Sequence, residues 1–286
     1  MLIELQNVSY VYSKGSPYEK TALDNINLKI NEGEFLAVIG HTGSGKSTLV
    51  QHFNGLISPT SGKVLVESED ISNLKNYSSI RQKIGIVFQY AENQLFEDTV
   101  YEDIAFGPKN MGYSEVEIER NVKKAMNIVK LDYEKYKDIN PYFLSGGEKR
   151  RAAVAGVLVM NPKVLVLDEP AAGLDPAGRE EILSEIKKFR EELNITVIIV
   201  SHSMEEVAKL VDRGVVMNDG KIIMDGTPVE IFRREDELIN VGLNIPQVTK
   251  IMRELKKRGA NVDSDAITIE QAKNSIEKYL KEVKNA

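Results

Sequence analysis

Residues 35–48 read FLAVIGHTGSGKST, and this stretch decides the fold class. It begins with an apolar run that ends in Gly40, which is typical of a strand buried on both faces. From Gly40 onward it matches G-x-x-x-x-G-K-[ST] and opens a helix that we expect from about Lys46 to Asn54. An incidental glycine-rich turn is the weaker interpretation, because a strand and a helix flank the pattern. We predict a loop that binds phosphate groups.

The residue types in this loop suit phosphate chemistry. Glycines let backbone N–H groups approach phosphate oxygens, Lys46 neutralises negative charge, and the Ser47 hydroxyl can bind Mg²⁺. We therefore assign nucleotide contacts to the whole loop: Gly40, His41, Thr42, Gly43, Ser44, Gly45, Lys46, Ser47 and Thr48.

Short apolar strands recur along the chain and alternate with helical patterns. They fall at 85–89, 164–169 and 196–202, which predicts an α/β fold with a mostly parallel core sheet covered on both sides. The first 30 residues alternate apolar and polar positions, which predicts two further strands of an antiparallel β subdomain. We expect a hairpin at Asp219-Gly220.

Two regions depart from this alternation. Residues of about 90–160 are charged and helix-periodic, and Ser114 and Glu117 form a capping-box pattern, so we expect an inserted helical subdomain. Residues 235–286 are charged and mainly helical in pattern. We predict a main domain over 1–234 and a C-terminal extension over 235–286, which we expect to pack on the domain and to strengthen pairing. Its apolar side would include Val248, Ile251, Met252 and Leu255.

Composition excludes several classes of protein. The 286 residues contain no cysteine, so disulfides and thiolate metal sites are absent. A net charge of −6 argues against a nucleic-acid partner. No apolar run approaches the ~20 residues of a spanning helix, so we expect any membrane association to come through a partner.

Polar residues follow three of the predicted core strands. Asp168 and Glu169 end VLVLDE, where Asp168 suits Mg²⁺ and Glu169 suits polarisation of an attacking water. Gln89 and His202 end two other strands, where Gln89 can reach Mg²⁺ or water and His202 the γ-phosphate. Alone, each of these residues would be interpreted as a solvated strand end. Beside the phosphate loop, we name Glu169, His202, Gln89 and Lys46 as catalytic, and Ser47, Gln89 and Asp168 as Mg²⁺ ligands.

A second glycine pair occurs in LSGGEKRR, where Ser145 precedes Gly146 and Gly147 at the start of a predicted helix. Together with GHTGSGKST, Gln89, VLVLDEPAAGLDP and His202, in this order, the segment resembles the nucleotide-binding subunit of ATP-binding-cassette (ABC) transporters. The resemblance covers residues 1 to about 232. It implies a P-loop NTPase of the ABC cassette type.

The resemblance also implies how the site residues work. Two subunits would sandwich two ATP molecules, and Ser145, Gly146 and Gly147 would contact the nucleotide of the other subunit, with Glu148 near its ribose. Asp175 would line the dimer contact, and Tyr12 would stack on adenine, unless it is only a strand-edge aromatic residue. Glu148 stands where the family usually has Gln, and Ala171 where Thr is usual.

A narrower resemblance is to the ATPase subunits of energy-coupling-factor importers, including the cobalt type. It depends on AFGP at 105–108 and IPQVTKIMREL at 245–255. It implies ATP and Mg²⁺ as cofactors, and three partners at the cytoplasmic face of the membrane. These are a second ATPase, identical or paralogous, a transmembrane coupling protein and a small substrate-capture protein. The ATPase of a conventional importer and a cytosolic ABC ATPase remain alternatives, and the sequence does not choose between cobalt, nickel and a vitamin.

Overall fold

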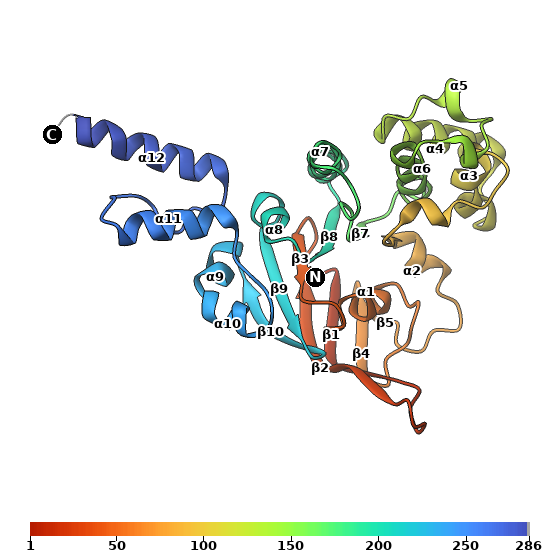
Figure 1. Cartoon of the computed structure of the whole chain (residues 1–286). Coiled ribbons are helices and arrows are strands. Elements are labelled where there is room, and N and C mark those ends of the chain that lie inside the picture. The colour runs from red at the N-terminus through yellow and green to blue at the C-terminus, as the bar shows by residue number, and fades with distance from the viewer. Residues whose placement is uncertain (285–286) are drawn as a thin grey trace.

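The computed structural model describes residues 1–284 and is built around one six-stranded sheet (Figure 1). Its strand order is β10-β9-β3-β8-β7-β6, with all neighbours parallel except the β9–β10 pair. The strands are β3 (Phe35–Ile39), β6 (Ile84–Val87), β7 (Val164–Asp168), β8 (Thr196–Ser201), β9 (Arg213–Asn218) and β10 (Lys221–Gly226). The predicted α/β class with a mostly parallel core sheet is confirmed.

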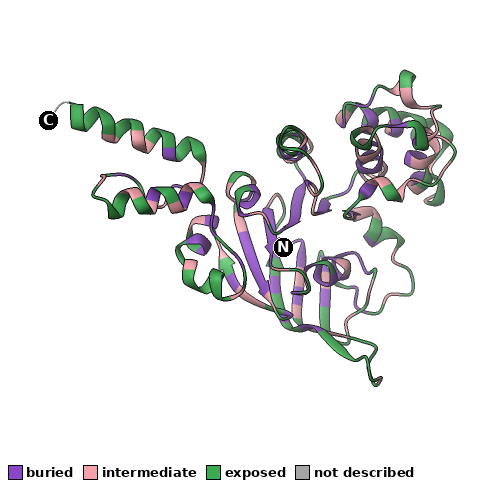
Figure 2. Ribbon diagram, viewed as in Figure 1, coloured by how far each residue is buried: buried purple, intermediate pink, exposed green. Residues whose placement is uncertain are grey.

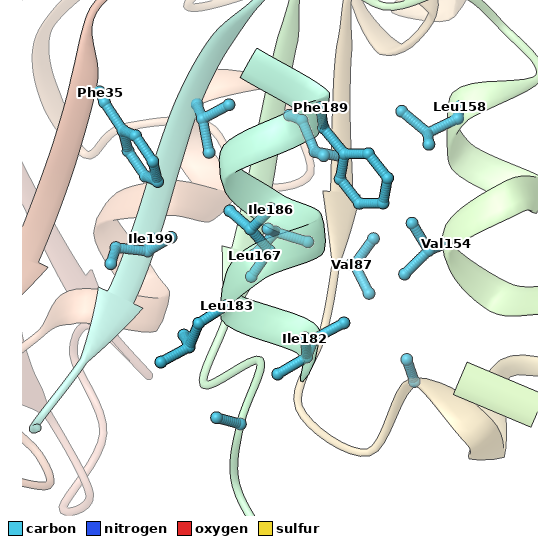
Figure 3. Close-up of a cluster of buried hydrophobic side chains, with 14 of the residues drawn as sticks. Phe35, Val87, Val154, Leu158, Leu167, Ile182, Leu183, Ile186, Phe189 and Ile199 are labelled. Atoms are coloured by element: carbon cyan, nitrogen blue, oxygen red, sulfur yellow. The ribbon is translucent and has the colours of Figure 1, made fainter. Parts of the chain in front are cut away.

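The central strands are apolar because both of their faces are covered. Every residue of β3, β7 and β8 is buried, and Figure 2 shows these strands as the purple centre of the molecule. On one face, Phe35, Leu167 and Ile199 pack against Ile186 and Phe189 of helix α7 (Pro176–Leu193), as Figure 3 shows. Alternate residues point to the other face and form a second core.

That second core joins the main sheet to a four-stranded antiparallel sheet. Its order is β2-β1-β4-β5. The strands are β1 (Ile3–Tyr12), β2 (Lys20–Ile30), β4 (Ser61–Val66) and β5 (Glu69–Asp70). Helix α1 (Lys46–Phe53) contributes Leu49 and Phe53 to the same core. The expected antiparallel sheet is therefore present, and it holds α1 from one side.

Helices fill the chain between β6 and β7. They are α3 (Val100–Asn110), α4 (Glu115–Ile128), α5 (Tyr133–Tyr136) and α6 (Gly146–Leu158), with short 3₁₀ turns η1 (Ala91–Gln94) and η2 (Pro141–Phe143). Ser114 and Glu117 form the predicted capping box at the start of α4. The β9–β10 hairpin turns at Asp219 and Gly220, whose φ values of 46° and 75° are those of the expected tight turn.

The C-terminal helices build a small core of their own. After α8 (Met204–Leu210), the chain forms α9 (Pro228–Arg233), α10 (Glu235–Asn240), α11 (Gln247–Lys257) and α12 (Ile269–Lys284). Met252 is fully buried among residues of α12 and of the segment that joins α11 to α12, and Val248 and Leu255 pack partly against this core. Ile251 is 57 % exposed, so the prediction that it belongs to the packed side was wrong. Helix α11 turns its apolar side to α12. Ion pairs of Arg233 with Asp265 and of Arg253 with Glu235 connect α11 and the segment after it to α9 and α10.

Within residues 1–284, the structure contains no helix with both the length and the apolar character that a membrane crossing requires.

Met252→Ala should loosen the C-terminal helices specifically. The change leaves a cavity in a small core and should cost about 2–3 kcal/mol of local stability. Hydrogen exchange should therefore accelerate in α11 and α12, with the exchange of β3, β7 and β8 unchanged. Ile251→Ala, on the exposed side of α11, is the matched control and should stay within about 0.5 kcal/mol. Equal effects of the two variants would contradict the assignment of this core.

Candidate functional site

The phosphate-binding loop lies between the end of β3 and the start of α1, where its glycines are required by geometry. Gly43 and Gly45 have φ values of 86° and 105°, a region that favours glycine. A Cβ on Gly45 would also lie 2.5 Å from the backbone oxygen of Ala22. One on Gly40 would lie 2.6 Å from the oxygen of Met217. The loop is therefore held closely between β2 and β9.

Lys46 is folded back across its own loop. Its Nζ donates to the backbone oxygens of Gly40 at 2.8 Å and His41 at 2.9 Å. Burial lowers the pKa of Lys46, and the nearby carboxylates of Glu169 and Asp168 partly counter this effect. A phosphate oxygen can replace these carbonyl acceptors and supply a full negative charge to a desolvated ammonium. A lysine in this position can donate to phosphate oxygens bound in the loop.

Asp168 and Ser47 are in direct contact at the foot of the loop. The Ser47 hydroxyl donates to Oδ2 of Asp168 at 3.0 Å. Burial raises the pKa of Asp168, although the Ser47 hydrogen bond counters the effect. A hydroxyl and a carboxylate are the hard oxygen donors that Mg²⁺ prefers, and a cation here would stabilise the buried charge. No group of three or more His, Cys, Asp or Glu side chains able to hold a metal occurs within residues 1–284. Ser47 and Asp168 could supply two oxygen ligands to Mg²⁺, which also takes ligands from water or phosphate.

Glu169 and His202 form a pair at the same sheet edge. Oε1 of Glu169 lies 2.7 Å from Nδ1 of His202, and the Glu169 backbone N–H donates to the oxygen of Val200. Glu169 has a φ of 51°, a left-handed conformation that costs about 1–3 kcal/mol in non-glycine residues. This bend turns its carboxylate out of β7. Gln89 lies in the exposed bend after β6, the strand next to β7.

Tyr12 borders a cavity of about 260 Å³ beside the loop. Its hydroxyl is 3.1 Å from Oγ1 of Thr48, and its ring meets that of Tyr10 edge-on at 4.8 Å. Tyr12 is 40 % exposed, so part of its side chain is accessible from outside the chain. The cavity is lined by Tyr12, Lys20, Ala22, Gly43, Gly45, Lys46, Ser47 and Thr48.

Sequence reasoning missed Lys20 and Ala22. Both come from β2, and Lys20 is paired with Tyr12 in the antiparallel ladder. The alternating pattern in the sequence predicted the strand β2 but not which of its residues lies opposite Tyr12, because that pairing depends on strand register. Lys20 adds a positive charge beside Lys46 in this cavity.

The segment around the second glycine pair, Gly146 and Gly147, lies apart from the phosphate-binding loop of the same chain (Figure 1). Ser145 is the N-cap of α6, and Figure 1 shows α6 among the inserted helices, apart from α1. A Cβ on Gly146 or Gly147 would meet no atom within 4 Å in the described part of the chain. The glycines thus leave open space at the start of a helix. Asp175 is the N-cap of α7 and accepts from the Gly178 N–H at 2.7 Å.

Arg150 connects α6 to the catalytic edge, a link that sequence reasoning did not identify. Its guanidinium donates to the oxygens of Pro170 at 3.0 Å and Ala172 at 3.3 Å, and lies 3.6 Å from Glu92. The signal in the sequence was a basic residue inside LSGGEKRR, but its partners depend on the tertiary fold.

The model of the ABC transporter family matches residues 23–172. The chain belongs to the ABC transporter family. The sequence-based resemblance and the predicted cassette fold are both confirmed.

Several relatives match over nearly the whole chain. An Energy-coupling factor transporter ATP-binding protein EcfA2 of Clostridium tetani is 56 % identical, over 98 % of each chain. A protein of the same name from Caldanaerobacter subterraneus is 50 % identical over the full length of both. Among solved structures, cbiO1 of Clostridium perfringens, described as part of the ABC transporter complex cbiONQ, has a TM-score of 0.73 and 41 % identity, and covers 88 % of this chain and 98 % of its own.

A dimeric ATP-binding cassette in a post-hydrolysis state, bound to ADP and Pi, also matches. Its TM-score is 0.70 at 31 % identity, and it covers 79 % of this chain and 99 % of its own. The narrower resemblance to energy-coupling-factor ATPase subunits agrees with the names of the full-length relatives.

Gly45→Ala should abolish nucleotide binding. The added Cβ would strain a residue with positive φ and would meet Ala22 at 2.5 Å, which displaces the loop. Gly15→Ala is the matched control, because Gly15 has a φ of 81° but open space around it in the described structure. Gly15→Ala should cost about 1 kcal/mol of stability and leave the affinity for a fluorescent ATP analogue unchanged. Normal affinity in Gly45→Ala would contradict the close fit of the loop.

Proposed function

We propose that this chain binds and hydrolyses ATP to drive an energy-coupling-factor importer for transition-metal ions of the cobalt type or for vitamins. The observation that carries the proposal is the meeting of the phosphate loop, Asp168, Glu169 and His202 at one sheet edge. Full-length similarity to energy-coupling-factor ATP-binding proteins supports the transport assignment, and cbiO1 supports the cobalt type.

The residues divide the reaction between them. Lys46 and the loop N–H groups bind the β- and γ-phosphates, and Tyr12 stacks on the adenine. Glu169 accepts the proton of the attacking water. His202, whose Nδ1 lies 2.7 Å from the Glu169 carboxylate, contacts the γ-phosphate. Because the Glu169 side chain is only 14 % exposed, little bulk water competes for it. Gln89 orients the water and connects the site to the membrane partner.

Mg²⁺ would be held by Ser47, Asp168 and Gln89. When bound, it neutralises charge that develops on the phosphate oxygens. The contact between Ser47 and Asp168 supports this assignment, since it places two hard oxygen donors within 3.0 Å of each other.

A second ATPase subunit would complete each ATP-binding site. Ser145, Gly146, Gly147 and Glu148 would contact the nucleotide bound to the partner's loop, and Asp175 would line the contact between subunits. The open space over both glycines supports this arrangement, because nothing described within the chain itself requires glycine there.

We assign further pairing surface to residues 235–286. Ile251, Leu280 and Val283 are more than half exposed there, which supports this role. Equal sedimentation of the full chain and of a chain that ends at residue 234 would contradict it.

The remaining partners are a transmembrane coupling protein and a small substrate-capture membrane protein. They would hold the chain at the cytoplasmic face of the membrane. Co-purification with such a capture protein, rather than with a separate binding protein, would distinguish this importer from a conventional one.

Glu169→Gln should stop hydrolysis in the assembled membrane complex. The amide is no longer a base, so phosphate release should fall by at least about a hundredfold. ATP binding should persist because Lys46 and the loop are intact. Glu119→Gln, on the exposed surface of α4, is the control and should retain wild-type release. Wild-type phosphate release by Glu169→Gln would remove Glu169 from its role.

Mixing two inactive variants tests the shared site. Lys46→Ala should bind ATP poorly, whereas Ser145→Arg should bind it normally but fail to complete the partner's site. Under conditions in which the chain pairs with itself, each mixed dimer has one intact composite site. It should trap one ATP, measured with radiolabelled nucleotide after rapid gel filtration. If wild-type dimers trap ATP and the mixture does not, the two glycines act within their own chain.

A further inference from the structure

The hydroxyl of Ser145 is already engaged within its own chain. It donates to Oε2 of Glu148 at 2.7 Å, and the Ser145 backbone N–H donates to the same oxygen at 2.8 Å. In return, the Glu148 N–H donates to the Ser145 hydroxyl oxygen at 3.3 Å. This is a complete capping box at the start of α6. The one proton that Ser145 could offer to a phosphate therefore points at a carboxylate.

The second oxygen of Glu148 is held as well. Tyr136 donates its hydroxyl proton to Oε1 of Glu148 at 2.5 Å, and Lys135 donates to the Tyr136 oxygen at 2.6 Å. The hydrogen bonds from Tyr136 and Ser145 lower the pKa of Glu148 to about 2. The carboxylate is consequently charged at any physiological pH. Both of its oxygens have fixed partners, so it does not leave Ser145 freely.

We propose that Glu148 restrains Ser145 and thereby sets the ATP concentration at which this subunit completes its partner's nucleotide site. The inference rests on the proposed function, in which Ser145 donates to the partner's γ-phosphate. To do so, the hydroxyl must break a charge-assisted hydrogen bond, which is about twice as strong as a neutral one. The carboxylate also places negative charge beside the arriving phosphate, and like charges repel. In this scheme Glu148 acts on the phosphate through Ser145, which is separate from the contact near the ribose that is proposed for it above.

The chain contains a matched capping box that lacks this role. At the start of α4, the Ser114 N–H and hydroxyl donate to Oε2 of Glu117 at 3.0 Å and 2.7 Å. The Glu117 N–H donates back to Ser114 at 3.4 Å. Both boxes lie in the inserted helices, but the Ser114 box opens a helix with Glu115 and Val116 instead of two glycines. A substitution at Glu117 therefore reproduces the loss of a cap without touching the shared site.

The test is ATP hydrolysis by the assembled complex of full-length chains, measured as phosphate release over a range of ATP concentrations. Glu148→Gln keeps an acceptor oxygen for the cap but removes the charge. The ATP concentration at half-maximal rate should fall roughly fivefold to tenfold, from the lost charge-assisted bond. The half-maximal ATP concentration should change by a larger factor than the rate at saturating ATP, because Glu169 and Lys46 are untouched. Glu117→Gln should keep the wild-type half-maximal concentration.

Tyr136→Phe is the second variant. It removes one of the hydrogen bonds that hold the Glu148 carboxylate and leaves Glu148 itself in place. The ATP concentration at half-maximal rate should therefore fall, but by less than in Glu148→Gln. This variant also keeps the inference testable if Glu148→Gln does not fold.

If Glu148 only caps helix α6 and does not restrain Ser145, the same experiments give different results. Glu148→Gln and Glu117→Gln would then lower the melting temperature alike and leave the half-maximal ATP concentration unchanged. That outcome, or a higher half-maximal concentration in Glu148→Gln, overturns the inference. Absence of ATP hydrolysis in the wild-type complex would instead overturn the proposed function, so the two failures are distinguishable.

Discussion

The parallel register of β3, β8 and β7 is the constraint on which the site depends. Ile39 is paired with Ser201, and Asp168 with Val200, so these three strands end at the same level. The residues that follow each strand are therefore brought to one edge: the phosphate loop, Glu169 and His202. Parallel strands place their carboxyl ends together, and polar residues there can meet without interrupting the apolar core.

This edge concentrates charge that the chain alone does not fully satisfy. Burial shifts the pKa of Lys46 downward and that of Asp168 upward, so both groups are disfavoured in their charged forms. The loop carbonyls and Ser47 compensate only in part. A polyphosphate and a divalent cation would restore the missing partners. Desolvation of Lys46 and Asp168 costs free energy in the free protein, and binding of the polyphosphate and the cation would offset this cost. The affinity for the nucleotide therefore depends on the position of the loop.

The inserted helices carry the residues that are proposed to contact the nucleotide of a second subunit. Arg150 joins α6, the helix that Ser145 caps, to the segment that follows Asp168 and Glu169. Ser145 itself faces outward, with open space over the neighbouring glycines. In the proposed dimer, each subunit would contribute one half of each of two nucleotide sites. Pairing, and not folding alone, would complete each of them.

Much of this arrangement could be predicted from the sequence because it depends on local backbone requirements. The loop glycines, the Asp219-Gly220 turn and the Ser114 capping box each follow from the conformation that their own residues must adopt. The alternation of buried strands with helices likewise determined the α/β class. Contacts between segments distant in sequence required the tertiary structure. Lys20 reaches the cavity through strand register, and Arg150 finds acceptors beyond β7. Ile251 faces outward because α11 turns toward α12, and the second oxygen of Glu148 is held because α5 brings Tyr136 to it. Sequence periodicity specifies which side of an element is apolar, but only packing decides what that side meets.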